Sequence, residues 1–143
     1  MKKRIKKIKL LKFNRNSDNR GSLTSVEGFN DIPIEIKRVF YLTDITKDRG
    51  GHAHIDTDQV IIAINGELNI TIFDGFNYYR RKMSNPHEGL YVPRKLFVDM
   101  KGFSSDCICL VIKNSNFYIM FYRNSSADIL KRPYNYLLKT FII

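Results

Sequence analysis

The chain contains no tryptophan, two cysteines, four prolines and three histidines among its 143 residues. None of its apolar runs approaches the roughly 20 residues that a membrane-spanning helix needs, so we expect no membrane partner. Met1 to Arg4 resembles the charged start of a signal peptide. Lysines at positions 6, 7, 9 and 12 interrupt the apolar region that should follow, so no secretory signal is expected. We expect a cytoplasmic protein.

The two cysteines, Cys107 and Cys109, lie two positions apart in an apolar run. In an extended strand they share one face, but neighbours on one strand face rarely have the geometry of a disulfide. We therefore expect two buried free thiols, which fits a reducing compartment.

No repeat, linker or low-complexity tract divides the chain, and its length predicts one domain over residues 1–143. The content of 43% hydrophobic and 13% aromatic residues favours a folded protein. The net charge of +10 suits an anionic partner, namely nucleic acid, anionic lipid or a phosphorylated metabolite. Much of this basic excess lies in the first fifteen residues, where a solubilising arm is an equally good interpretation.

Short segments rich in β-branched and aromatic residues recur along the chain, separated by turns of Gly, Asn and Asp. Asn65-Gly66 and Asp74-Gly75 each predict a tight hairpin. We expect strands at 5–13, 23–26, 34–43, 52–54, 60–64, 67–73, 78–83, 89–92, 96–100, 106–112 and 117–122, and polar loops at 14–21 and 28–33. Only 126–130 and 136–142 look helical. The pattern predicts an all-β sandwich or barrel such as a jelly roll, with at most a short C-terminal helix.

The stretch Asp48-Arg-Gly-Gly-His-Ala-His54 holds two of the three histidines. His52 and His54 stand at i and i+2, so in a strand both imidazoles point to the same face. The Gly50-Gly51 pair predicts a flexible turn just before them, where backbone can approach a ligand. One histidine could merely pack while the other is solvated, but the pairing on one face favours a functional role.

The spacing His52-x-His54-x4-Gln59-x6-Gly66 resembles the first motif of the cupins. In metal-binding cupins the Gln59 position is a glutamate, and a second motif supplies a further histidine where this chain has Val98. Two imidazoles without a carboxylate or a third nitrogen fall short of the usual three protein ligands. We therefore expect no metal.

A closer resemblance, over residues 9 to 113, is to the sugar nucleotide 3,4-ketoisomerases of the cupin superfamily. The stretches that carry it are Asn19-Arg-Gly-Ser-Leu23, Ile36-Lys-Arg-Val-Phe-Tyr41, Arg49-Gly-Gly-His-Ala-His54, Gln59-Val60, Gly89-Leu-Tyr-Val-Pro93 and Phe103-Ser-Ser-Asp-Cys107. The resemblance implies a cupin-type jelly roll, a double-stranded β-helix. It implies an enzyme that shifts the ketone of dTDP-4-keto-6-deoxyglucose from C4 to C3 without a cofactor. The products of such enzymes feed 3-amino-3,6-dideoxy sugars of bacterial surface polysaccharides.

The same resemblance sets expectations for the ends of the chain. Residues 1–13 are expected to include an N-terminal strand exchanged between the subunits of a homodimer. Residues 117–143 depart from the acidic C-terminal stretch of the family and form a divergent tail.

Moving a ketone to the next carbon requires removal of the C3 proton, an enediol, and a proton returned to C4. Histidine is the side chain best suited to this near neutral pH. We expect one of His52 and His54 to remove the proton, and the other to shuttle hydroxyl protons or polarise the enediolate; the sequence leaves open which does which. Tyr41 is a candidate acid or hydroxyl-binding group, and an inward Gln59 could hold the imidazoles or a sugar hydroxyl.

A diphosphate substrate calls for guanidinium groups, for which Arg20 and Arg49 are the candidates. Lys37 and Arg38 are further candidates, of which strand alternation sends one outward. Tyr91 or another aromatic could stack on thymine.

Other functions remain open from sequence. A sugar nucleotide 3,5-epimerase is also a metal-free jelly roll, although the His-Ala-His pair is not its pattern. A basic nucleic-acid-binding barrel suits the net charge, but the basic residues cluster at the N-terminus and do not interleave with aromatics. A metal-dependent cupin oxygenase is a third alternative. The stereochemistry of the product at C4 is not readable from the sequence.

Overall fold

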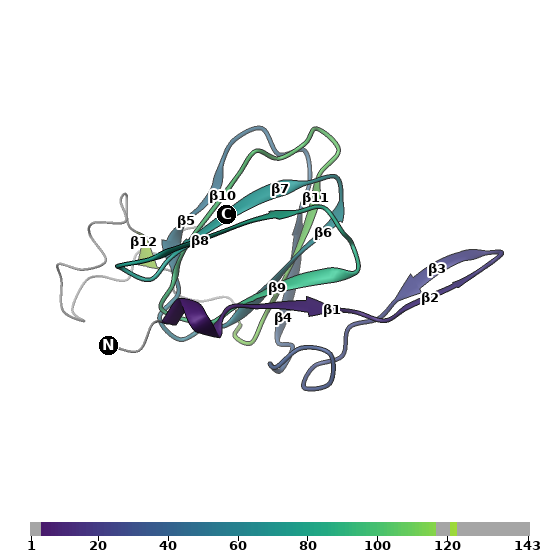
Figure 1. Ribbon diagram of the computed structural model, residues 1–143, viewed down its shortest axis with the longest axis horizontal. Helices are drawn as coiled ribbons and strands as arrows, with labels where there is room; N and C mark the ends of the chain where they lie inside the picture. The colour runs from purple at the N-terminus through teal and green to yellow at the C-terminus, as the bar shows by residue number, and fades with distance from the viewer. Residues whose placement is uncertain (1–3, 117–120, 123–143) are drawn as a thin grey trace.

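The structure, a computed structural model, describes residues 4–116 and 121–122 (Figure 1). A short 3-10 helix, η1 (Arg4–Lys7), precedes the strands. The strands are β1 (Lys9–Lys12), β2 (Arg15–Asp18), β3 (Gly21–Thr24), β4 (Arg38–Leu42), β5 (Arg49–Ala53), β6 (Gln59–Asn65), β7 (Leu68–Phe73), β8 (Tyr78–Met83), β9 (Glu88–Val92), β10 (Phe97–Lys101), β11 (Ile108–Lys113) and β12 (Phe121–Tyr122).

Two five-stranded sheets form the body of the molecule, with strand orders β1-β9-β6-β11-β4 and β12-β5-β10-β7-β8. Neighbouring strands in both sheets run antiparallel. Because most neighbours are not consecutive in sequence, the chain passes repeatedly from one sheet to the other, as in a jelly roll. The predicted all-β class and jelly roll are confirmed. The turns at Asn65-Gly66 and Asp74-Gly75 connect β6 to β7 and β7 to β8 as predicted.

The core lies between the two sheets, and β6 is buried on both of its faces. Ile61 and Ala63 of β6 pack into the core between the sheets, where both are fully buried. Val60 and Ile62 point the other way, into a second apolar cluster with Phe13, Ile32, Ile34 and Ile112. Burial on both faces explains why β6 has a continuous apolar run and no alternation.

The segment before β4 supplies that second cluster and is not part of the strand. The sequence predicts a strand over 34–43, whereas β4 begins at Arg38. Ile34 is instead 2% exposed beneath β6, and its carbonyl accepts a hydrogen bond of 3.1 Å from the Phe29 N–H. The gain from burying Ile34 outweighs continuing the strand ladder.

The N-terminal region differs from prediction at two points. The expected strand over 5–13 is a 3-10 turn followed by β1, which pairs with β9 of its own chain; exchange of this strand with a second copy stays a prediction. The expected polar loop over 14–21 is wrong, because β2 and β3 form a hairpin that projects from the body (Figure 1). Side-chain hydrogen bonds from Arg15 and Ser17 to Ser22, of 2.8 to 3.0 Å, stabilise this polar hairpin.

Both cysteines are buried free thiols, as predicted. Burial raises the pKa of Cys109 to about 12. No helix among the described residues is long and apolar enough to cross a membrane. The possible helices at 126–130 and 136–142, and all but the last two residues of the strand expected over 117–122, lie outside the described residues.

Candidate active site

A cavity of about 260 Å³ opens between the two sheets, with β4, β6 and β11 on one side and β5 and β10 on the other. Its apolar lining comes from Phe40, Leu42, Val98, Met100 and Val111. Its polar lining comes from Arg38, Asp48, Arg49, His52, Gln59 and Lys113. A concave, mostly apolar site with a few convergent polar groups is what a small ligand requires.

A bulge in β5 presents the first histidine to this cavity. Gly50 has φ 83°, and a Cβ there would lie 2.7 Å from the Val98 carbonyl of β10. The register of β10 against β5 shifts at this point. The Gly50-Gly51 pair is therefore not a flexible turn before the strand, as the sequence suggested, but a bulge within it. The Gly50 carbonyl lies 3.0 Å from His52 Nδ1 and fixes the orientation of the ring.

The two imidazoles lie side by side, with ring centroids 4.9 Å apart and an interplanar angle of 85°. The prediction that they share one face is confirmed. His54 follows the end of β5 and is only 6% exposed. Its carbonyl accepts a 2.6 Å hydrogen bond from the Lys95 N–H, which anchors its backbone beside the turn before β10.

Lys113, the last residue of β11, lies 3.0 Å from His54, measured from Nζ to Nε2. Burial, and then the charge of Lys113, lower the pKa of His54 to about 2. Burial also lowers the pKa of His52. The pKa of Lys113 falls to about 8, first through burial and then through the nearby charge of Arg38. At neutral pH the site therefore holds two neutral imidazoles and one ammonium group.

Strand β4 divides its residues between the cavity and solvent. Arg38 and Phe40 face the cavity, with the Arg38 guanidinium 4.8 Å from the centre of the Phe40 ring. The Lys113 ammonium lies 5.1 Å from the centre of the same ring, so one aromatic ring stabilises two cations. Tyr41 points outward and is 68% exposed. Lys37, just before the strand, is exposed and pairs with Glu35 at 3.6 Å.

The structure brings together five of the candidate residues around one cavity: Arg38, Arg49, His52 and Gln59 line it, and His54 contacts His52 beside it. It does not bring Tyr41, Lys37, Arg20 or Tyr91 to that cavity. Arg20 lies in the turn of the β2–β3 hairpin, 2.6 Å from the Asp18 carboxylate. Tyr91, on β9, packs against the second apolar cluster.

Lys113 is the residue of this site that sequence reasoning missed. The signal was present, because Cys109, Val111 and Lys113 alternate along one strand and must share a face. The first two are apolar and buried, which places the lysine on the inward face as well. Its Cα partner across the sheet is Gln59, another cavity residue.

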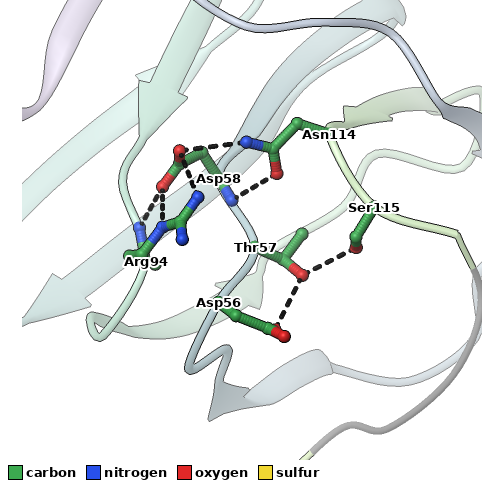
Figure 2. A network of polar contacts seen from close by, with 6 residues as sticks. All are labelled: Asp56, Thr57, Asp58, Arg94, Asn114 and Ser115. Atoms are coloured by element: carbon green, nitrogen blue, oxygen red, sulfur yellow. Dashed lines mark hydrogen bonds and ion pairs between the residues drawn. The ribbon is translucent and has the colours of Figure 1, made fainter.

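A polar network joins the loop before β6, the turn before β10 and the segment after β11 (Figure 2). The Asp58 carboxylate accepts hydrogen bonds from the Arg94 N–H and guanidinium and from the Asn114 amide. The hydroxyls of Thr57 and Ser115 form a hydrogen bond of 2.7 Å. Burial raises the pKa of Asp58, but the hydrogen bonds from Arg94 outweigh it and lower the pKa below its usual value. Because Asn114 follows Lys113 directly, the network fixes the end of β11.

Metal-ligating side chains are sparse around the cavity. Within 4–116 and 121–122, no three His, Cys, Asp or Glu side chains are grouped to hold a metal ion.

Comparisons with known proteins point in one direction. A family model described as "FdtA: WxcM-like, C-terminal" matches residues 6–131. The chain is 35% identical over 129 residues to a TDP-4-oxo-6-deoxy-alpha-D-glucose-3,4-oxoisomerase of Aneurinibacillus thermoaerophilus, covering 86% of this chain and 93% of that protein.

Two solved structures are similar over most of their length. The WlaRB TDP-quinovose 3,4-ketoisomerase of Campylobacter jejuni matches with a TM-score of 0.82 and 34% identity, over 89% of this chain and 99% of that one. A histidine-to-asparagine variant of the 3,4-ketoisomerase QdtA of Thermoanaerobacterium thermosaccharolyticum, in complex with TDP-4-keto-6-deoxyglucose, matches with a TM-score of 0.79 and 30% identity. That match covers 85% of this chain and 91% of that one.

Proposed function

This chain belongs to the FdtA family, and on that premise we propose that it is a 3,4-ketoisomerase that moves the ketone of dTDP-4-keto-6-deoxyglucose from C4 to C3. The observation that carries the proposal is the pair of neutral imidazoles beside one cavity, with rings 4.9 Å apart. The reaction needs one group to take a proton from carbon and another to serve the neighbouring oxygens. No redox cofactor enters the proposed chemistry, because the substrate is its own oxidant and reductant.

His52 is the base in this proposal. The Gly50 carbonyl can only accept a hydrogen bond, so His52 carries its proton on Nδ1 and its lone pair on Nε2. Burial lowers the pKa of His52, so the ring is unprotonated at neutral pH and can accept the C3 proton. The imidazolium then returns a proton to C4.

His54 is the histidine that serves the sugar oxygens. Its Nε2 accepts a hydrogen bond from the Lys113 ammonium, so it is not poised to take a second proton. With its pKa near 2, it stays neutral throughout the working range. We assign to it the stabilisation of the enediolate oxygens, in which a preorganised polar group contributes most in a water-poor site.

We assign the binding of the anionic part of the substrate to Arg38 and Arg49, because both line the cavity. Gln59, also in the lining, is a candidate for a sugar hydroxyl. Arg20, Lys37, Tyr41 and Tyr91 lie outside this lining, so a direct role for any of them requires a second copy of the chain or a larger substrate footprint.

A homodimer is part of the proposal. Strands β2 and β3 are exposed along almost their whole length, and Leu23 at the centre of β3 is 61% exposed. A second copy that covers this hairpin would bury Leu23 and bring Arg20 into contact with the surface of that second copy. Light scattering on the purified protein tests this: we expect twice the chain mass, and a monomer at micromolar concentration would contradict it.

The wider setting follows from the chemistry. A 3-keto product is what an aminotransferase needs to make a 3-amino-3,6-dideoxyhexose, and such sugars occur in lipopolysaccharide and O-antigen. The two buried free thiols fit the cytoplasm, where we place the enzyme.

Incubation with dTDP-4-keto-6-deoxyglucose in D2O, followed by NMR, tests the function. We expect a 3-keto product. Protium at C4 would indicate that His52 transfers the C3 proton directly, and deuterium there would indicate that the ring exchanges with solvent first. The same reaction in H2O gives the coupling between H4 and H5, and with it the C4 configuration. His52→Asn and His54→Asn should lose turnover and keep dTDP binding. His87→Asn is the matched control, because His87 does not line the cavity and its Nδ1 instead forms a 2.7 Å hydrogen bond with the Thr24 hydroxyl. Full activity in both cavity variants would end the assignment.

The alternatives predict different outcomes in the same assays. A 3,5-epimerase would place deuterium at C3 and C5 and leave the ketone at C4. A nucleic-acid-binding barrel would show salt-dependent binding to a random oligonucleotide. A metal-dependent oxygenase would contain stoichiometric metal by elemental analysis. The family match favours the isomerase over all three.

A further inference from the structure

Lys113 is a buried cation to which the proposed function assigns no step. Its side chain faces the cavity from the end of β11, and the residue is only 4% exposed. Lysine is almost never fully buried unless something pairs with it, because removing an ammonium group from water is costly.

The surroundings of Lys113 do not neutralise its charge. Its hydrogen-bond partner is the neutral His54, and its other close contact is the Phe40 ring. Among the described residues, no carboxylate lies within salt-bridge distance of it. The charged and titratable groups that line or adjoin the cavity around it are Arg38 from β4, Asp48, Arg49 and His52 at and before β5, and His54.

We propose that Lys113 is a catalytic residue: its ammonium group hydrogen-bonds the sugar oxygen that becomes negative and passes a proton between the two neighbouring oxygens. This inference rests on the proposed isomerase function and deepens it. His54 keeps the role given to it above and also positions Lys113, because its Nε2 accepts one ammonium hydrogen and leaves the other two available for the sugar oxygens.

The step balances without any co-reactant. His52 takes the proton from C3, the C3–H electron pair becomes the C3=C4 double bond, and the C4=O pair moves to the C4 oxygen. That oxygen takes a proton from the Lys113 ammonium. The neutral amine then accepts the proton of the C3 hydroxyl as the C3 ketone forms, and the double-bond electrons take the proton of the His52 imidazolium at C4. Both side chains end as they began.

The acidity of Lys113 suits this exchange. Burial, and then the charge of Arg38, lower its pKa to about 8, close to the pH at which the enzyme must work. A general acid is most effective when its pKa lies near the working pH, because it is then both protonated and ready to release its proton. Above about pH 8 the acid form is depleted, so the rate should fall there.

Substitution of Lys113 tests the inference. Lys113→Met keeps the length and removes the charge; we expect kcat to fall about 100-fold, the loss typical for one oxyanion donor. The KM and the affinity for dTDP should change by less than about threefold. Lys82→Met, an exposed lysine on β8 paired with Glu67, is the matched control and should leave both parameters unchanged.

The pH profile separates a catalytic lysine from a structural one. Wild-type kcat should fall above about pH 8, and Lys113→Arg, whose side chain stays charged, should move that fall to higher pH. Lys113→Arg also decides the matter if Lys113→Met does not fold. If Lys113→Met retains the wild-type kcat, or if Lys113→Arg leaves the alkaline fall of kcat at the same pH, the role of Lys113 is overturned while the proposed isomerase function stands. A wild-type protein that makes no 3-keto product overturns the proposed function, and this role with it.

Discussion

Arg94 binds Asp58 with its own N–H and with two guanidinium nitrogens, at 2.8, 3.0 and 3.0 Å. The pair joins the residue before β6 to the turn before β10 (Figure 2). The Asp58 side chain is only 15% exposed, so solvent screens the interaction less than it screens a surface ion pair. The pair therefore fixes the start of β6 to the turn before β10.

Asp58→Ala should lower the free energy of unfolding by about 1–3 kcal/mol, because Arg94 and Asn114 lose their acceptor. Urea denaturation of wild type and variant measures the change. The control is Asp18→Ala on the β2–β3 hairpin. The Asp18 carboxylate pairs with Arg20 at the exposed surface, so this substitution should leave the urea midpoint unchanged. If the two substitutions lower the unfolding free energy equally, the Asp58–Arg94 pair stabilises the fold no more than an exposed ion pair does.

Gly50→Ala should be more damaging than Gly51→Ala, although both glycines have positive φ. A Cβ at Gly50 would lie 2.7 Å from the Val98 carbonyl, whereas nothing lies within 4 Å of a Cβ at Gly51. Left-handed backbone costs both variants about 1 kcal/mol, and only Gly50→Ala must also move β10. Thermal melts should rank the two, and kcat should fall in Gly50→Ala because the carbonyl that orients His52 shifts. The reverse ranking contradicts the bulge as the cause.

Acid should destabilise the fold through His54. Its pKa is about 2 in the folded protein and 6.5 in the unfolded chain, so between these values only the unfolded chain binds the proton. Stability is therefore full above pH 6.5 and falls as the pH is lowered toward 2, with a slope of at most about 1.4 kcal/mol per pH unit. His54→Gln should flatten the dependence of the unfolding free energy on pH between 4 and 6.5. The pKa of His52 is lowered too, so some slope should remain.

Neutralising Arg38 should weaken substrate binding, and neutralising Lys37 should not. Arg38 lines the cavity, and loss of a charge-assisted hydrogen bond to the substrate should raise the KM by about 10- to 100-fold in Arg38→Met. Arg38→Met should also move the alkaline fall of kcat upward, because Arg38 lowers the pKa of Lys113. Lys37→Met keeps the wild-type KM, since Lys37 is exposed beside Glu35. Matching KM values in the two variants would show that the face assignment of β4 does not matter for binding.

Local patterns predicted most of the fold. The hairpin turns, the β-rich composition and the His-x-His spacing are short-range signals, and each matched the structure because period-2 alternation decides which side chains share a face. The polar hairpin β2–β3 escaped prediction because its stability comes from Arg15, Ser17 and Ser22 reaching across it, with no apolar alternation to mark it. Ile34 was misplaced because only the tertiary fold shows that β6 has a second buried face.

The candidate site was predictable where its residues lie close in sequence. Arg49, His52 and His54 come from one strand and its end, and Gln59 begins the next. Lys113 is 59 residues from His54, and only the pairing of β11 with β6 brings it into the cavity. Tyr41 was predicted as a site residue but points outward, and Lys37 and Arg38 were both candidates, because sequence gives the alternation of a strand but not which face turns inward.

The two cysteines have a practical consequence for solution studies. Cys107 is 3% exposed and Cys109 is fully buried, and burial raises the pKa of both thiols, so neither offers an accessible thiolate to a maleimide or spin label. We therefore expect the folded native protein to react with neither reagent. A single cysteine introduced at an exposed position could be spin-labelled selectively to measure distances between two copies of the chain, without replacing Cys107 and Cys109.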